Sequence, residues 1–403
     1  MDKDSRLLNY VGKFLLYALM TPIYWISRLI PKNNNIWIFG AWFGEQYNDN
    51  SKYLFEYVNQ YHPQIKAIWL SKNKIIIDQI RTKGYNAYHA YSIKGFIYSA
   101  KAKVGIVNMG IIDLNKFIPP DTIINLWHGI PLKKIMYDDE INKSLTNNRI
   151  KKLKKLVFPF TRYPENSEMM IACAPEDQKN IASAFKLPVE KVKITGYPRN
   201  DALFVPKIDE LSNSHKVLYT PTHRRAGKIN IGKLLVNGIF EIDNELNKLN
   251  TTLYIKLHFC HQNEIDQLEN TINIHNLSNI KIVKDKDIEG DIYTYLSKFD
   301  TLITDYSSIY FDYLLTNKPI IFAPFDLDDY LKNDREQYYN YNDVTPGPKC
   351  ANWPEICKWI ALFKANPSLY SNERESIKNK FHQFQNSNSS KRVCEEILKL
   401  ISL

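Results

Sequence analysis

Short apolar segments alternate with helical patterns along most of the chain. The first unit is residues 36–40 (IWIFG), followed by a polar loop at 43–49 and by apolar residues at helical spacing from Tyr53 to Val58. Strands that alternate with helices of about ten residues predict parallel β-sheets with crossover helices on both faces. In such sheets, ligands bind beyond the carboxyl ends of the strands. The chemically active residues are therefore expected just after each predicted strand.

The chain is long enough for two such sheets. Its 403 residues are too many for one compact core and suit two domains of about 150–200 residues. The alternation lapses into Pro, Ser, Asn and charged residues around 205–215, which predicts an interdomain linker. We predict one doubly wound α/β domain at residues 32–205, a second at 206–365, and C-terminal helices at 366–403 that can pack back on the first domain. The predicted strands are residues 36–40, 65–71, 87–89, 103–107, 122–127, 168–174, 192–195, 216–219, 253–257, 280–283, 301–304 and 319–323.

Residues 1–31 form a separate amphipathic segment. The apolar stretch 14–27 (FLLYALMTPIYWIS) contains Pro22 and is shorter than the about 20 residues that a membrane-spanning helix needs. Apolar residues recur at helical spacing from Leu7 to Leu19, and basic residues are present at Lys3, Arg6, Lys13 and Arg28. This pattern predicts a helix that lies in the plane of an anionic membrane surface. The alternative is a first helix packed on its own domain.

Composition narrows the class of protein. A hydrophobic content of 44% with 24% charged residues argues against a disordered chain and against a polytopic membrane protein. The net charge of +10 favours anionic partners, but no DNA- or RNA-binding motif is present, so no nucleic acid is predicted. The five cysteines are widely spaced, without a CxxC or a Cys/His cluster. This usage predicts a reducing cytosol and no metal site.

His128 follows the predicted strand 122–127, where the chain enters the Gly-Pro turn of 125–134 (NLWHGIPLKK). A histidine there has buried chain behind it and open space ahead, with Lys133 and Lys134 close by. Such a side chain suits a proton acceptor that faces an anionic substrate, although a loop histidine beside solvated lysines gives the same pattern.

Residues suited to phosphate follow three strands of the predicted second sheet. Thr222 lies in TPTHRR (220–225), where hydroxyls and either Arg224 or Arg225 suit a diphosphate. Lys256 and His258 flank Leu257 on a predicted strand and so point to the same side.

The third group is Asp305–Asp312 (DYSSIYFD), which places Ser307 and Ser308 at the start of a predicted helix. Exposed backbone N–H groups there favour an anion, although capping of the helix by Asp305 or a serine is an equal alternative. Asp312, one turn further on, can reach a ribose or polyol hydroxyl. Because the ends of neighbouring strands meet at one edge of a sheet, the three groups are expected to converge on one crevice.

Five motifs together resemble the CDP-glycerol glycerophosphotransferase family, the teichoic-acid primases and polymerases. The motifs are WHGIPLKK at 127–134, GYPRND at 196–201, PTHR at 221–224, KLH at 256–258 and DYSSIYFD at 305–312. They occur in the family's order, and the resemblance extends over most of the chain. It implies a GT-B architecture, in which the second Rossmann-like domain binds a CDP-alditol and the first meets the acceptor at the membrane.

The resemblance also implies roles for individual residues. His128 is expected to be the general base, with Trp127, Gly129, Ile130 and Pro131 beside it. Donor-binding residues are expected to be Arg199, Pro221, Thr222, Arg224, Lys256, Leu257, His258, Ser307, Ser308 and Asp312. The family's polymerases often carry a longer N-terminal region, and HRR follows the PT of this chain, which leaves open whether Arg224 or Arg225 contacts phosphate.

The activity implied is transfer of glycerol phosphate or ribitol phosphate from CDP-glycerol or CDP-ribitol, with release of CMP, in teichoic acid or capsule biosynthesis. The acceptor is expected to be an undecaprenyl-linked saccharide or a growing polyol-phosphate chain at the cytoplasmic face of the membrane, with no cofactor required. Two alternatives stay open. One is a GT-B glycosyltransferase that uses a nucleotide sugar. The other is a non-enzymatic protein that binds anionic polymer or membrane through the basic stretch 151–155.

Overall fold

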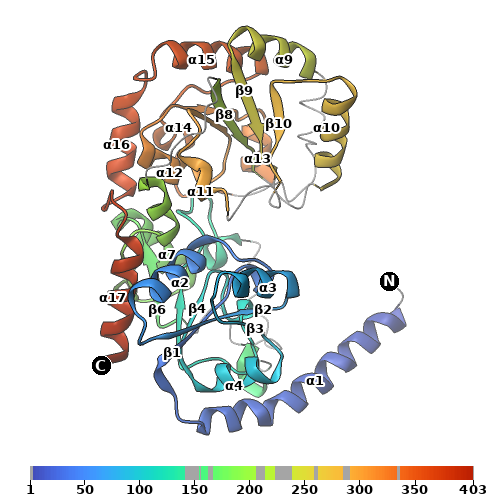
Figure 1. The fold of residues 1–403 in the computed structure, drawn as a ribbon, viewed down its shortest axis with the longest axis vertical. Coiled ribbons are helices and arrows are strands. Elements are labelled where there is room, and N and C mark those ends of the chain that lie inside the picture. The colour runs from blue at the N-terminus through green and yellow to red at the C-terminus, as the bar shows by residue number, and fades with distance from the viewer. Residues whose placement is uncertain are drawn as a thin grey trace.

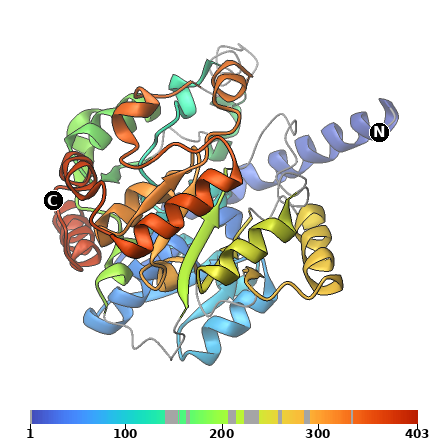
Figure 2. The same cartoon turned by 90° about the horizontal axis from the view of Figure 1, so that it is seen from above.

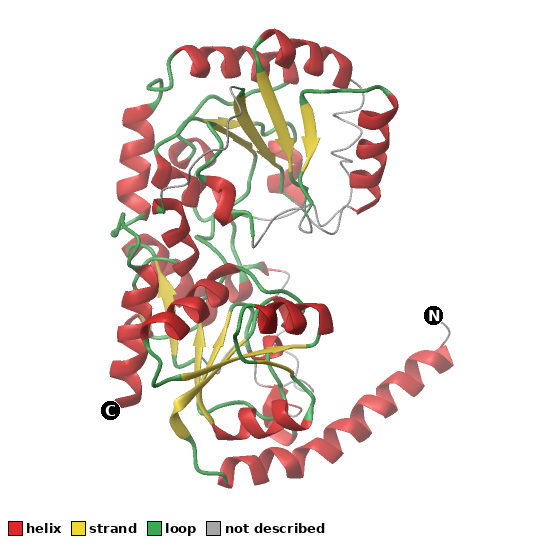
Figure 3. Ribbon diagram, in the orientation of Figure 1, coloured by secondary structure: helices red, strands yellow, loops and turns green. Residues whose placement is uncertain are grey.

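The part of the chain that the structure describes forms two parallel β-sheets, one in each half of the molecule (Figure 3). The computed structural model describes residues 3–140, 154, 156–161, 167–205, 214–222, 238–257, 262–284, 291–333 and 336–402. Within these residues, the first sheet has the strand order β3-β2-β1-β4-β5-β6-β7 and the second has the order β10-β9-β8-β11-β12. Every paired strand is parallel to its neighbour, which confirms the predicted parallel α/β organisation.

The strands of the first sheet are β1 (Asn33–Phe39), β2 (Lys66–Ser71), β3 (Ala87–His89), β4 (Ala102–Val107), β5 (Thr122–Asn125), β6 (Met169–Ala172) and β7 (Val192–Ile194). Those of the second are β8 (His215–Thr220), β9 (Thr251–Ile255), β10 (Ile280–Ile282), β11 (Thr301–Thr304) and β12 (Ile320–Phe322). The described α-helices are α1 (Lys3–Leu29), α2 (Asp49–Tyr61), α3 (Lys74–Thr82), α4 (Ile93–Lys101), α7 (Pro175–Phe185), α9 (Ile239–Lys248), α10 (Gln262–Ile274), α11 (Tyr293–Leu296), α12 (Ile309–Tyr313), α13 (Leu327–Asn333), α14 (Tyr341–Val344), α15 (Trp353–Ala365), α16 (Ser371–Phe381) and α17 (Ser389–Ser402).

Both faces of the first sheet are buried, which is why its strands are apolar without alternation. In β1, Trp37 and Phe39 pack into one hydrophobic core while Ile36 and Ile38 pack into another. Successive side chains of a strand point to opposite faces, so the short run IWIF supplies both cores. Helices cover each face, as the crossover pattern requires.

The C-terminal helices connect the two halves. α16 and α17 run down one side of the molecule, from the half that contains β8 to the half that contains β1 (Figure 1). There α17 packs against α2 and against the 3-10 helix η6 (Pro198–Phe204). The Asp201 carboxylate accepts hydrogen bonds from the backbone N–H groups of Ser389 and Ser390, both at 2.8 Å. A carboxylate at this position stabilises the N-terminus of α17.

Several predicted strands end earlier than the apolar pattern suggested, and for β5 and β9 the difference affects predicted site residues. β5 ends at Asn125 rather than at Trp127, because Trp127 adopts a left-handed backbone conformation with φ 51°. β9 ends at Ile255 rather than at Leu257. Lys256 and Leu257 therefore lie on the chain that leaves the strand, beyond the edge of the sheet.

α1 packs on the first half of the molecule through one face only. Tyr17, Met20 and Tyr24 contact a cluster that includes Phe117 and Phe160, and Arg28 forms an ion pair with Asp121 at 2.9 Å. Pro22 lies inside the continuous helix instead of breaking it. The N-terminal end of α1 projects away from the rest of the molecule in both views (Figures 1 and 2). Among the described helices, none is long and apolar enough to cross a membrane.

Candidate active site

A cleft of about 320 Å³ lies between the two halves of the molecule. The first half lines it with Trp42, Gln46, Asn48, Asp49, His128 and Arg199. The second half lines it with Thr220, Pro221, Lys256, Leu257, Asp291, Ile292, Tyr293, Ser307, Ser308 and Ile309. Most of these residues follow the carboxyl end of a strand, where ligand sites of parallel sheets are found.

His128 lies in a turn after β5, and hydrogen bonds hold the backbone of this turn in place. The Asn50 side-chain amide donates hydrogen bonds to the carbonyl oxygens of Leu126 at 3.2 Å and of Trp127 at 3.0 Å. The imidazole packs against two indoles, with ring centroids 3.8 Å from Trp127 and 5.3 Å from Trp42. These contacts hold the imidazole at the wall of the cleft, where a general base has to meet its substrate.

Gly129 brings the two halves into close contact. Its φ of 137° disfavours any side chain, and a Cβ atom there would lie 2.8 Å from Arg199 Nη2 and 3.0 Å from Ser308 Oγ. Only glycine satisfies both the backbone conformation and the close approach. The turn that carries His128 is thereby held beside Ser308, which begins a helix in the other half.

The wall from the second half is rich in hydrogen-bond donors. Ser307 and Ser308 precede α12, and the Ser308 side chain makes no capping hydrogen bond to that helix. Lys256 lies beyond β9, and its backbone N–H donates to the carbonyl oxygen of Tyr219 at 2.9 Å. The ammonium and the hydroxyls can all donate to phosphate oxygens.

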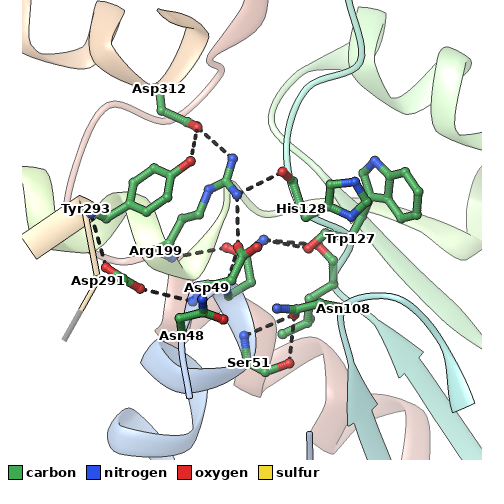
Figure 4. A network of polar contacts seen from close by, with 12 residues as sticks. Asn48, Asp49, Ser51, Asn108, Trp127, His128, Arg199, Asp291, Tyr293 and Asp312 are labelled. Atoms are coloured by element: carbon green, nitrogen blue, oxygen red, sulfur yellow. Dashed lines mark hydrogen bonds and ion pairs between the residues drawn. The ribbon is translucent and has the colours of Figure 1, made fainter. Parts of the chain in front are cut away.

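Arg199 lies at the centre of a buried polar network (Figure 4). Its Nη1 donates to Asp49 Oδ1 and to the His128 carbonyl oxygen, both at 2.9 Å, and its Nη2 donates to Asp312 Oδ2 at 2.6 Å. Asp49 begins α2 in the first half, whereas Asp312 belongs to α12 in the second. Arg199 is only 2% exposed, so one buried guanidinium joins the two halves and the turn of His128.

Burial and charge act in opposite directions in this network. Burial disfavours the charged form of Arg199, but the carboxylates of Asp312 and Asp49 outweigh it and hold the arginine pKa well above its usual value. Burial raises the pKa of Asp49 in spite of the neighbouring guanidinium. The Tyr293 hydroxyl donates a further hydrogen bond to Asp312 Oδ2 at 3.0 Å. The network therefore depends on the arginine as its cation.

Comparison with known proteins assigns the family. Residues 22–399 match the family model described as CDP-Glycerol:Poly(glycerophosphate) glycerophosphotransferase. The chain belongs to this family. The match confirms the family predicted from the five motifs and the prediction that the chain is a glycerophosphotransferase.

Similar proteins agree with this assignment. The glycerophosphotransferase is 28% identical to the teichoic acid glycerol-phosphate transferase of Staphylococcus aureus, over 97% of this chain and 99% of that one. It is 27% identical to the teichoic acid poly(glycerol phosphate) polymerase of Bacillus spizizenii, over 98% of this chain and all of that one. A solved structure of the wall teichoic acid polymerase TagF superposes with a TM-score of 0.76 at 22% identity, over 99% of this chain and 97% of that one. This likeness supports the same fold.

The structure brings seven of the predicted site residues of this glycerophosphotransferase into the cleft: His128, Arg199, Pro221, Lys256, Leu257, Ser307 and Ser308. Trp127, Ile130 and Pro131 are buried behind the His128 turn. Thr222 is also buried, and its backbone N–H donates to Asp305 Oδ1 at 2.8 Å. Arg224, Arg225 and His258 lie outside the described residues, as does most of the basic stretch 151–155.

Two predicted donor-binding residues have other partners here. Asp312 is fully buried, and its carboxylate accepts hydrogen bonds from Arg199 and Tyr293. Both terminal nitrogens of Arg199 are occupied by protein oxygens. The motif spacing suggested substrate contact because each residue follows a strand or begins a helix. Their mutual ion pair across the two halves was not visible in the sequence.

Several cleft residues were not predicted from the sequence. Trp42, Gln46, Asn48 and Asp49 come from the polar loop that follows β1. The expectation that ligands gather at the carboxyl ends of strands applies to this loop as well, and would have identified it. Asp291 and Tyr293 follow no motif and are brought to the cleft by tertiary packing. Among the described residues, no group of three or more His, Cys, Asp or Glu side chains is arranged to hold a metal ion.

Proposed function

We propose that this protein transfers glycerol phosphate, or ribitol phosphate, from its CDP conjugate to a hydroxyl of a polyol-phosphate chain or an undecaprenyl-linked saccharide. The observation that carries the proposal is the composition of the cleft. His128 lines one wall, and Lys256, Ser307 and Ser308 line the other. Two parallel sheets with a ligand cleft between them also support the GT-B architecture. The names of the similar proteins support a role in making teichoic acid or a capsule polymer.

In the proposed reaction, the acceptor hydroxyl oxygen attacks the β-phosphorus of the CDP-alditol. The new P–O bond forms as the bond from that phosphorus to the bridging oxygen breaks, and CMP leaves with the bridging oxygen. His128 takes the proton of the attacking hydroxyl. Lys256, Ser307 and Ser308 stabilise the charge that develops on the phosphate oxygens, since stabilisation of charge dominates phosphoryl transfer. These steps use residues of the chain and no cofactor.

A donor panel tests this function. Purified protein is incubated with CDP-glycerol, CDP-ribitol and UDP-sugars in turn, together with a lipid-linked or polyol-phosphate acceptor, and release of CMP or UDP is measured. We expect CMP release from a CDP-alditol that requires the acceptor. Release of UDP would instead support a glycosyltransferase. If none of the nucleotides raised the thermal unfolding temperature of the protein and no product formed, the result would support the non-enzymatic alternative.

We further propose that α1 docks the enzyme on the cytoplasmic face of the membrane as a peripheral protein. Large apolar side chains on the outer face of the helix are exposed, among them Phe14 (60%), Leu15 (62%) and Leu19 (67%). Each buried leucine contributes about 1.5–3 kcal/mol, and the positive charge of the chain adds attraction to anionic lipid. Arg28 is excluded from this lipid contact because it pairs with Asp121.

Sedimentation with anionic lipid vesicles tests the membrane proposal. The double substitution L15E/L19E is expected to lower the bound fraction at least about tenfold, because two charges replace apolar contact with the bilayer. Ile75 on α3 is the matched control, since it is 67% exposed, as Leu19 is. I75E should bind vesicles as the unchanged protein does. Equal binding by all three proteins would contradict docking through α1.

A further inference from the structure

Asp291 connects the two halves of the molecule at the cleft, which it lines (Figure 4). It lies two residues before α11 in the second half, and its Oδ1 accepts a hydrogen bond from the Tyr293 N–H at 3.1 Å. Its carboxylate also accepts two hydrogen bonds from α2 in the first half. The Asp49 N–H donates to Oδ2 at 3.0 Å, and the Tyr53 hydroxyl donates to Oδ1 at 2.5 Å. No step of the proposed reaction uses Asp291.

Asp291 supplies the cap that α2 lacks. The first N–H groups of an α-helix have no partner inside the helix, and the residue before the helix usually supplies a side-chain oxygen for them. In α2 that residue is Asn48, whose side chain makes no capping hydrogen bond. The Asp291 carboxylate takes this place, and its negative charge suits the positive end of the helix dipole. The first turn of α2 is therefore held by a residue of the other half.

The first turn of α2 in turn holds the backbone around His128. The Asn50 side-chain amide donates to the carbonyl oxygens of the two residues that precede His128. Asn50 Oδ1 accepts a hydrogen bond from the Arg199 N–H at 3.2 Å, and Asp49 Oδ1 accepts one from Arg199 Nη1 at 2.9 Å. The same Nη1 donates to the His128 carbonyl oxygen. A displacement of the first turn of α2 would therefore move the general base.

The backbone of Asp49 is strained. Its φ of 60° lies in the left-handed region, which a residue other than glycine keeps only where its surroundings hold it. Trp42 Nε1–H and the Arg199 guanidinium donate to the Asp49 carboxylate, and Asp291 accepts from the Asp49 N–H. Trp42 and Arg199 belong to the first half, so of these three contacts the one with Asp291 depends on the position of the second half. If the halves separated, the first turn of α2 would be free to relax.

We propose that Asp291 is a positioning residue that couples closure of the cleft to the placement of His128. When the two halves are together, its carboxylate caps α2 and fixes the turn that carries the imidazole. When they separate, the cap is lost and the imidazole is no longer held for proton transfer. The base is fully aligned only while the half that binds the donor is closed over the other half. This inference rests on the proposed function and adds to it a cause for the alignment of the general base.

Kinetics of D291N test the positioning role. Asparagine has the same size, but only one of its two terminal atoms accepts hydrogen bonds. We expect kcat to fall about tenfold because the base is displaced, while the KM values of the donor and the acceptor change less than about twofold. Y53F removes one of the two contacts with α2 and should lower kcat about threefold. The double substitution D291N/Y53F should cost less than the product of the separate effects, because both remove the same contact.

Tyr338 provides the matched control for Tyr53. Its hydroxyl donates to Asp138 Oδ2 at 2.6 Å, so it also joins a tyrosine to an aspartate across the two halves. Neither Tyr338 nor Asp138 lines the cleft or belongs to α2. Y338F should keep kcat and both KM values. An equal loss of kcat in Y338F and Y53F would contradict the inference, because it would show that any bond between the halves has the same effect as the cap.

Hydrogen exchange tests the same role without transfer. In D291N, the backbone N–H groups of residues 49–52 and 126–130 should exchange about tenfold faster than in the unchanged protein, because local opening of these segments becomes easier. Y53F should show the same change to a smaller degree. The N–H groups of β2 should exchange at the same rate in all variants. In Y338F, residues 49–52 should exchange as they do in the unchanged protein.

Two further results would overturn the inference. A rise of either KM in D291N with kcat unchanged would make Asp291 a substrate contact. Unchanged exchange at residues 49–52 and 126–130 in D291N would show that Asp291 does not hold the His128 turn. Absence of acceptor-dependent CMP release from the unchanged enzyme would instead overturn the proposed function, and the exchange experiment would still decide whether Asp291 holds this turn.

Discussion

Replacing His128 with alanine is expected to lower kcat by about 10²–10⁴-fold, the usual contribution of a general base, with little change in the affinity for the CDP donor. The donor should bind largely to the second half of the molecule, where Lys256, Ser307 and Ser308 line the cleft. His128 lies on the opposite wall, so its loss should affect the proton transfer more than donor binding. CMP release under saturating substrate measures kcat, and isothermal titration with CDP-glycerol measures the affinity.

A second substitution and a control make this result specific. H128N keeps a polar side chain of similar size but removes the base, so its kcat should fall as far as that of H128A. His89 is the matched control because it is a histidine at the carboxyl end of another strand of the first sheet, β3, and it is exposed and does not line the cleft. H89A should retain full activity. Unchanged turnover in H128A would remove His128 from the reaction.

Substituting Arg199 with lysine is expected to lower kcat about 10–100-fold with the donor KM nearly unchanged, since small displacements of a catalytic group are costly. A lysine ammonium keeps the charge but cannot reproduce the fork that binds Asp49, Asp312 and the His128 carbonyl oxygen together. The His128 turn should lose part of its support. The free energy of unfolding should also fall by about 1–3 kcal/mol, because buried hydrogen bonds are lost.

Arg374 provides the control for stability alone. It is 1% exposed, it donates to the backbone carbonyl oxygens of Asn317, Leu369 and Pro367, and none of these residues lines the cleft. R374K should be destabilised to a similar degree and keep its kcat. Denaturant unfolding and steady-state kinetics on both variants make the comparison. A rise in donor KM in R199K with kcat unchanged would show that Arg199 binds the donor phosphate, as its motif first suggested.

Local pattern was sufficient to predict much of the architecture. Runs such as IWIF in β1 are apolar because both faces of a parallel sheet are covered, and this composition is visible in the chain itself. The same pattern predicted the residues at which the strands end less accurately. β5 stops two residues early because Trp127 takes a left-handed conformation, and Gly129, two residues further on, faces Arg199 and Ser308 from distant parts of the chain.

The sequence by itself determined the family, the alternation of strands and helices, and the prediction of residues such as His128 and Ser308 at strand ends, because each of these depends on nearby residues. Only the tertiary structure decided which of them share a wall of the cleft. It paired Arg199 with Asp312, 113 positions away, and packed the Trp42 ring against that of His128. Ion pairs and ring contacts of this kind depend on distances between segments remote in the chain, and no local pattern encodes such distances.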